Sequence, residues 1–244
     1  MSTEKKLMAF TLYPGVTPLD MVGPLTVLRN VGIGWPFRTV VVGERLEPMA
    51  TDTPLQMIPA RTFAEVPDPF ALIVPGGGPA TIQAIRDESL LAYVRSAAQT
   101  AQVVGSTGNG ALILAAAGLL ARRRAAIHWA YGELLESLGA TYARQRWVED
   151  GRFLTAAGVS AGIDMALYLV SRLTDEATAR RVQLALDYDP HPPFGRIDWA
   201  HVPRLPRLVR GGISLAAPLI AAKPRRLTRS ECRLPAQVPG ASTS

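Results

Sequence analysis

Residues 103–120 read Val-Val-Gly-Ser-Thr-Gly-Asn-Gly-Ala-Leu-Ile-Leu-Ala-Ala-Ala-Gly-Leu-Leu, and this stretch decides the fold. Val103 and Val104 precede a cluster of turn residues, which predicts a short buried strand. The Ala/Leu run from Ala111 predicts a helix, with Gly118 near its last turn. A sharp turn between strand and helix lifts one side chain above a sheet and directs backbone N–H groups towards it. Enzymes use such an elbow to hold a nucleophile, but this tip consists of glycines interleaved with Ser, Thr and Asn.

Short apolar runs alternate with longer helical patterns on both sides of the elbow. This alternation predicts a single α/β domain over residues 1–195, with a mostly parallel sheet covered on both faces. Strands are expected at 6–13, 37–43, 55–58, 71–74, 103–104 and 125–128 with two more within 141–156, and helices at 17–32, 88–102, 111–120, 131–138, 158–173 and 176–186.

The composition is that of a globular chain with a sizeable core. The chain has 244 residues, and 48% of them are hydrophobic, which suffices for one large domain. No run of about 18 uninterrupted apolar residues is present, so no membrane span is expected, and the first residues are not expected to form a signal peptide. Cys232 is the single cysteine, which excludes an intrachain disulfide and fits a cytoplasmic setting. Three histidines and one cysteine disfavour a zinc site.

The basic character of the chain belongs to its C-terminal part. The formal net charge is +6, and residues 196–244 hold nine Lys/Arg and two acids. Such a Pro/Arg-rich extension can contact nucleic acid or acidic lipid, or it can be a solvated surface segment. We favour the solvated extension and disfavour a nucleic-acid partner, because no aromatic interleaving or recognition helix accompanies the basic residues.

Several motifs together resemble the isonitrile hydratase branch of the ThiJ/PfpI superfamily, over roughly residues 6–195. The resemblance implies a class I glutamine-amidotransferase-like (flavodoxin-like) fold, which is a three-layer sandwich, and a homodimer. The motifs that carry it are Thr-Leu-Tyr-Pro-Gly-Val-Thr-Pro-Leu-Asp (11–20), Val-Gly-Pro (22–24), Leu-Ile-Val-Pro-Gly-Gly-Gly (72–78), Gly-Ala-Leu (110–112), Ala-Ala-Gly-Leu-Leu (116–120), Ile-His-Trp (127–129), Asp-Gly (150–151) and Gly-Val-Ser-Ala-Gly-Ile-Asp-Met (158–165).

The elbow departs from the family pattern, which is Cys-Thr-Gly-Ala-Leu with Cys as the nucleophile. Counting back from Gly110, Gly108 replaces this Cys and Asn109 replaces the Thr. In the family the thiolate attacks the isonitrile carbon, and an acid near the first helix helps to activate water. The resemblance assigns that acid to Asp20, but Gly108 cannot form a covalent intermediate.

Asp20 is the first candidate catalytic residue. It either stabilises the first turn of a helix through the helix dipole, by about 0.3–1 kcal/mol, or acts as a general acid or base with a pKa raised by an apolar environment. Gly76, Gly77 and Gly78 follow a buried strand. Their amides are candidates for holding an oxyanion or substrate, and the alternative is a plain strand-to-loop turn.

Further candidates lie at the elbow and after the next strand. Asn109 either contacts a substrate carbonyl or positions a water, or it is a turn residue that tolerates left-handed backbone. His128 is a candidate base or a packed, capping histidine. Trp129 and the amide of Gly108 are assigned to substrate binding. The glycine spacing is the reverse of a dinucleotide fingerprint, so no nucleotide cofactor is expected.

These residues predict a cofactor-free lyase, hydratase or cyclase that acts on a small organic molecule, with Asp20 as the proton-transferring group and no metal. The alternative is a non-catalytic small-molecule-binding or regulatory protein that keeps the family pocket. Burial of Asp20 against apolar groups is expected of a catalyst and is not required of a binder.

Overall fold

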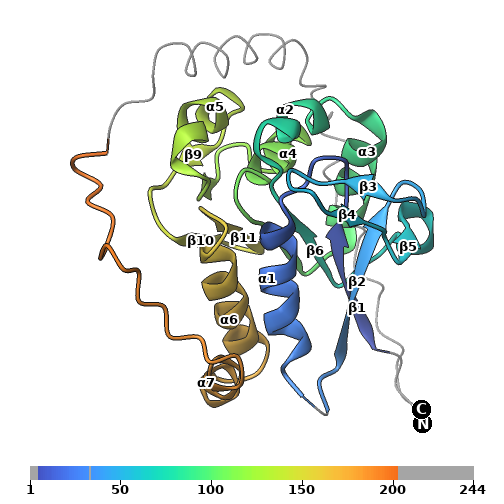
Figure 1. Ribbon diagram of the computed structural model, residues 1–244. Helices are drawn as coiled ribbons and strands as arrows, with labels where there is room; N and C mark the ends of the chain where they lie inside the picture. The colour runs from blue at the N-terminus through green and yellow to red at the C-terminus, as the bar shows by residue number, and fades with distance from the viewer. Residues whose placement is uncertain (1–4, 33, 203–244) are drawn as a thin grey trace, which may run out of the picture.

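A seven-stranded sheet forms the centre of the computed structural model, which describes residues 5–32 and 34–202 (Figure 1). Its strand order is β10-β11-β7-β6-β1-β2-β5, and every neighbouring pair is parallel except β10 and β11. The α/β fold with a mostly parallel sheet is therefore confirmed. The sheet strands are β1 (Lys6–Thr11), β2 (Phe37–Gly43), β5 (Arg61–Thr62), β6 (Ala71–Val74), β7 (Val103–Ser106), β10 (Trp147–Asp150) and β11 (Phe153–Ala156).

Helices cover both faces of this sheet and make the outer layers of the sandwich (Figure 1). On one face α1 packs against α6, which packs against α7. On the other face α3 and α4 pack against β6, and α2 contacts α4. The helices are α1 (Pro18–Arg29), α2 (Thr81–Ala84), α3 (Glu88–Thr100), α4 (Ala111–Ala116), α5 (Gly132–Ser137), α6 (Ala161–Leu173) and α7 (Glu176–Ala185).

The central strands are apolar because both of their faces are covered. All four residues of β6 are buried, as are all four of β11. This is the pattern of parallel strands between two helical layers. Four short strands lie outside the main sheet, as the pairs β3 (Met49–Ala50) with β4 (Gln56–Met57) and β8 (Arg124–Ala125) with β9 (Thr141–Tyr142).

Several predicted boundaries were wrong. The first strand ends at Thr11 rather than at residue 13, because the chain already turns towards α1 there. The predicted strand 125–128 is limited to Arg124–Ala125 and pairs with β9 outside the main sheet. The elbow helix ends at Ala116, and Gly118 follows in left-handed backbone with φ of 81°. The strand expected at 103–104 continues to Ser106, which pairs with Val74 of the adjacent β6.

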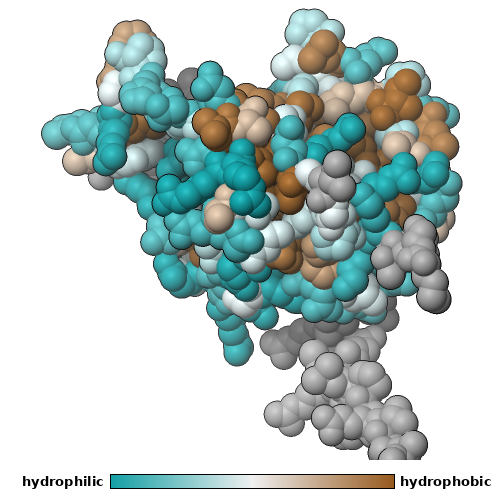
Figure 2. Space-filling model, turned by 90° about the horizontal axis from the view of Figure 1, so that it is seen from below, coloured by the Kyte–Doolittle hydropathy of each residue, from teal (hydrophilic) through white to brown (hydrophobic). Residues whose placement is uncertain are grey.

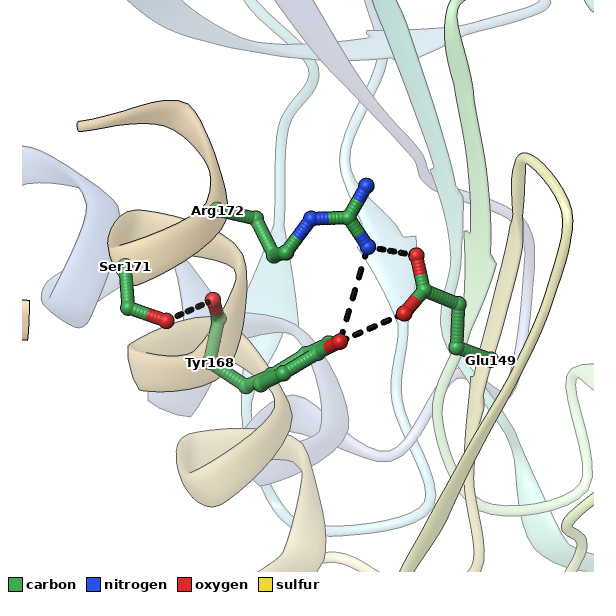
Figure 3. Close-up of polar contacts among 4 residues, drawn as sticks. All are labelled: Glu149, Tyr168, Ser171 and Arg172. Carbon is green, nitrogen blue, oxygen red and sulfur yellow. Dashed lines mark hydrogen bonds and ion pairs between the residues drawn. The ribbon is translucent and has the colours of Figure 1, made fainter. Parts of the chain in front are cut away.

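Polar side chains tie α6 to the antiparallel edge of the sheet (Figure 3). Glu149 of β10 forms an ion pair with Arg172 and accepts a 2.5 Å hydrogen bond from the Tyr168 hydroxyl. The Ser171 hydroxyl donates to the Tyr168 carbonyl at 2.7 Å within the same helix. Asp164, in the first turn of α6, pairs with Arg146 just before β10. The contacts of Tyr168, Arg172 and Asp164 hold α6 against β10 and the residues that precede it.

Figure 2 shows the face of the molecule at which the parallel strands begin. Hydrophilic and hydrophobic residues are mixed on this face. A cavity of about 420 Å³ lies there, between the last turn of α1 and the start of β2, and Lys5, Arg29 and Arg38 line it. The cavity is remote from Asp20, since Arg29 lies nine residues further along α1, which is about 14 Å.

None of the helices in the described residues has the length and apolar character that a membrane span requires. The basic extension predicted for residues 196–244 lies outside the described residues from position 203 onward.

Candidate functional site

The start of α1 places Asp20 next to the loops that follow the carboxyl ends of β6 and β7. Thr17 precedes the helix and Pro18 is its first residue. The Thr17 hydroxyl does not cap the helix, because it donates to Asp52 at 2.5 Å, while the Thr17 N–H donates to Gly76 O at 2.8 Å. Asp20 lies in the first turn and is only 2% exposed.

The elbow after β7 meets α1 at Asp20. The Thr107 N–H donates to Val74 O, and the Thr107 hydroxyl donates to the main-chain carbonyl of Asp20 at 2.8 Å. A Cβ at Gly110 would lie 2.1 Å from Val74 O, so only glycine permits this approach of the elbow to β6. One buried hydrogen bond thus joins the first turn of α1 to the elbow that follows β7.

Gly108 stands at the tip of the elbow in left-handed backbone, with φ of 56°. A Cβ built there would lie 2.3 Å from Oδ2 of Asp20. The Asp20 carboxyl therefore occupies the space that the first carbon of an elbow side chain would need. The other carboxyl oxygen, Oδ1, is buried and has no hydrogen-bond partner among the described residues.

The environment of Asp20 favours its neutral form. Burial, as the largest cause, and the charge of Asp52 raise the pKa of Asp20 to about 7, against a hydrogen bond from the Gly76 N–H that acts to lower it. A carboxyl group without a buried cation is costly to ionise away from water. Near neutral pH Asp20 thus exists both as a proton donor and as a proton acceptor, which suits general acid–base catalysis.

Asn109 connects the elbow to the loop after β6. Its Oδ1 accepts hydrogen bonds from the Gly77 N–H and the Thr81 hydroxyl, both at 3.0 Å, and its Nδ2 donates to Gly78 O at 2.6 Å. Thr81 also accepts from the Gly77 N–H at 2.9 Å. The amide of Asn109 is therefore largely engaged in holding the two loops together.

These contacts change the expectation for the glycine amides. The N–H groups of Gly76 and Gly77 already have acceptors within the site, so they are not available to an oxyanion. The N–H groups of Gly78, Gly108 and Asn109 donate to no protein group among the described residues. The elbow amides next to Asp20 are thus the better candidates for binding a developing negative charge.

His128 and Trp129 lie at the side of the elbow. The His128 N–H lies 3.4 Å from Gly108 O, and its ring Nδ1 accepts from the Ala130 N–H at 3.3 Å. Burial lowers the pKa of His128, so the ring is neutral at neutral pH. The ring centroids of His128 and half-buried Trp129 are 5.7 Å apart. His128 is thus both a capping residue and a neighbour of the elbow, and no described contact joins its ring to Asp20.

Four further polar residues belong to the site and were not predicted. The Tyr13 hydroxyl donates to Pro75 O at 2.9 Å and meets the Thr81 hydroxyl at 3.2 Å, and burial raises the pKa of Tyr13. Burial also raises the pKa of Tyr131, against a hydrogen bond from Asn109. Asp52 comes from the β3–β4 hairpin. Tyr13 lies within the family motif at residues 11–20, so the sequence offered a signal for its place in the site. Asp52 lies in a polar, Pro-containing stretch that matches no motif, so the sequence offered no such signal.

The structure therefore brings together Asp20, Gly76–Gly78, Gly108 and Asn109, and it sets His128 and Trp129 beside them. The segment 158–165 also reaches this point, because a Cβ at Gly162 would lie 2.9 Å from the Thr107 side chain. No group of three or more His, Cys, Asp or Glu side chains in the described part of the chain is arranged to hold a metal ion.

The chain is similar to known proteins over most of its length. The DJ-1/PfpI family matches residues 6–172. Isonitrile hydratase from Pseudomonas putida is 42% identical over 190 residues, which are 77% of this chain and 80% of that protein. The HTH-type transcriptional regulator CdhR from Pseudomonas aeruginosa is 33% identical over 113 residues, which are 45% of this chain and 31% of the regulator.

Solved structures share the fold. A ThiJ/PfpI family protein from Pseudomonas syringae has a TM-score of 0.79 and 32% identity, and the match covers 90% of this chain and 91% of that one. DJ-1β from Drosophila melanogaster has a TM-score of 0.67 at 19% identity, with 76% of this chain and all of that chain covered. This second likeness shows the three-layer architecture alone.

Proposed function

Because the chain belongs to the DJ-1/PfpI family, we propose that it is a hydratase-like enzyme that works without a cysteine nucleophile. Its relative of 42% identity is an isonitrile hydratase, which supports the addition of water to a small organic molecule as the reaction class. No cysteine precedes Cys232, so the elbow offers no thiolate. Catalysis then depends on proton transfer and positioning, with Asp20 as the transferring group.

The observation that carries this proposal is the position of the Asp20 carboxyl next to Gly108. It is buried, has a pKa of about 7, and reaches the position that an elbow side chain would occupy. Oδ1 is buried and lacks a protein partner among the described residues, so its capacity to form a hydrogen bond is unused within the fold. A helix acid with only a dipole role needs neither this burial nor this pKa.

For an isonitrile the atoms balance without a covalent enzyme intermediate. Protonated Asp20 gives its proton to the terminal carbon, which leaves a cationic carbon–nitrogen group and an Asp20 carboxylate. Water then adds its oxygen to that carbon while the carboxylate takes a proton from the water. The product is a formimidic acid that tautomerises to the N-substituted formamide, and Asp20 is again protonated.

The same donor serves other small substrates in which a proton initiates reaction, including lyase and cyclase chemistry on a carbonyl compound. The second candidate is a ligand-binding or regulatory role, since the regulator CdhR contains a related segment. Burial of the titrating carboxyl favours the enzyme over this alternative.

The test is turnover of a panel of alkyl and aryl isonitriles and small carbonyl compounds by the purified protein and by Asp20→Asn. We expect the variant to lose about 10²-fold or more in turnover while ligand affinity largely persists, because the amide keeps the volume but cannot titrate. Asp68→Asn is the matched control, since this exposed acid contacts only Thr100 among the described residues. Unchanged turnover in Asp20→Asn would favour the ligand-binding role.

A further inference from the structure

The β3–β4 hairpin places a second carboxylate at the candidate site. The hairpin lies beside the carboxyl end of β1 (Figure 1). It is attached to the loop before α1 by two main-chain hydrogen bonds, from Gly15 N–H to Ala50 O at 2.8 Å and from Asp52 N–H to Val16 O at 3.2 Å. These bonds fix the backbone of Asp52 next to the residues that lead into Asp20.

The side chain of Asp52 is also fixed. Its Oδ2 accepts the 2.5 Å hydrogen bond from the Thr17 hydroxyl, three residues before Asp20. The same oxygen would lie 3.9 Å from a Cβ at Gly78, whose carbonyl holds Asn109. Asp52 is exposed, so it stands at the rim of the site between the start of α1 and the glycine loop.

We propose that Asp52 is a positioning residue for the proposed reaction: its carboxylate, held by Thr17 beside the glycine loop, fixes a negative charge at the rim of the site that favours proton donation by Asp20. The negative charge at the rim disfavours a second negative charge on Asp20, and it adds to the effect of burial. This inference rests on the proposed function only in assigning Asp20 as the acid.

Other groups around Asp20 do not supply the opposite charge. Tyr13 is neutral because its pKa is raised, and the pKa of Tyr131 is raised as well. His128 is neutral, and Asp164 of α6 is paired with Arg146. Among the described residues no Lys or Arg acts on the pKa of Asp20. The charge of Asp52 is therefore the nearby charge that a substitution can remove without entering the buried site.

The test is a carbon-detected NMR titration of the Asp20 carboxyl, with Asp20→Asn used to identify its resonance. Asp52→Asn keeps an oxygen for Thr17 but removes the charge, and the midpoint for Asp20 should fall by about 0.5–1 pH unit. Asp68→Asn removes the same charge elsewhere on the surface and should leave the midpoint in place. High salt should reduce the difference between wild type and Asp52→Asn, because Asp52 is exposed.

Kinetics give the second readout. A general acid is active in its protonated form, so turnover should fall as the pH rises through the Asp20 midpoint, and in Asp52→Asn this fall should occur at lower pH. An Asp20 midpoint that is the same in wild type and Asp52→Asn would overturn the inference about Asp52. Full turnover in Asp20→Asn would overturn the proposed function instead, and the NMR titration remains informative in that case because it needs no substrate.

Discussion

At the scale of single residues, the cost of keeping Asp20 in place is a pH-dependent loss of stability. The folded-state pKa of about 7 is above the ordinary value of 3.8, so the folded protein holds the proton more tightly than the unfolded chain. The stabilising effect of that proton is complete below about pH 4 and is lost as the pH rises through 7. The ionised carboxylate therefore destabilises the fold at alkaline pH.

Asp20→Asn removes this titration. Relative to the variant, the wild type should lose about 2–3 kcal/mol of unfolding free energy between pH 5 and pH 8, from the pKa difference at 1.36 kcal/mol per unit. Urea denaturation of both proteins at the two pH values measures this double difference. Parallel pH dependences would mean that Asp20 titrates near its ordinary range in the folded protein.

At the scale of elements, the elbow and α1 compete for one small volume. Gly108→Ala forces a Cβ against the Asp20 carboxyl and also places a side chain at positive φ. Gly118→Ala is the matched control, because Gly118 has φ of 81° but no atom within 4 Å of its Cβ position. We expect about 1 kcal/mol of destabilisation at residue 118 and about 2–4 kcal/mol at residue 108.

The excess at residue 108 should come from Asp20. In an Asp20→Ala background it should shrink, and a double-mutant cycle on unfolding free energies reports the coupling between residues 20 and 108. Additive effects in the cycle would show that Asp20 is not the neighbour that resists the new methyl group.

The elements themselves could largely be predicted from the sequence, because their signals are local. The strand at 71–74 and the helix that begins near residue 17 needed no distant information, and both elements are confirmed. The limits of the elbow helix could not be predicted, because its Ala/Leu run continues through the turn that ends it. The family pattern identified Asp20, Gly77 and Asn109 as candidates. Asp52 joins the site through a contact with Thr17, 35 residues away in sequence, and Thr81 through a contact with Asn109, 28 residues away, and such contacts leave no local pattern.

At the scale of the whole molecule, we expect a homodimer. Leu19 and Val22 lie one turn apart on α1 and are 51% and 43% exposed, so they form an apolar face on the helix that carries Asp20. Light scattering at micromolar concentration should give the mass of two chains, and Leu19→Glu should lower it. Leu184→Glu changes an equally apolar residue, 80% exposed on α7, and should leave the mass unchanged. A wild-type monomer would refute this expectation.

The strand order also sets when the site can exist during synthesis. β6 and β7 lie between β1 and β11, so the first strand lacks its inner neighbour β6 until residue 74 has been made, and β7 follows only at residues 103–106. At about 5–20 residues per second, the ribosome needs about 4–18 s to pass from Asp20 to Gly108. During that interval α1 has no elbow to pack against, and its apolar face and carboxylate remain in water. A nascent chain released before residue 108 therefore contains Asp20, Asp52 and the glycine loop, but not the elbow that packs against the Asp20 carboxyl.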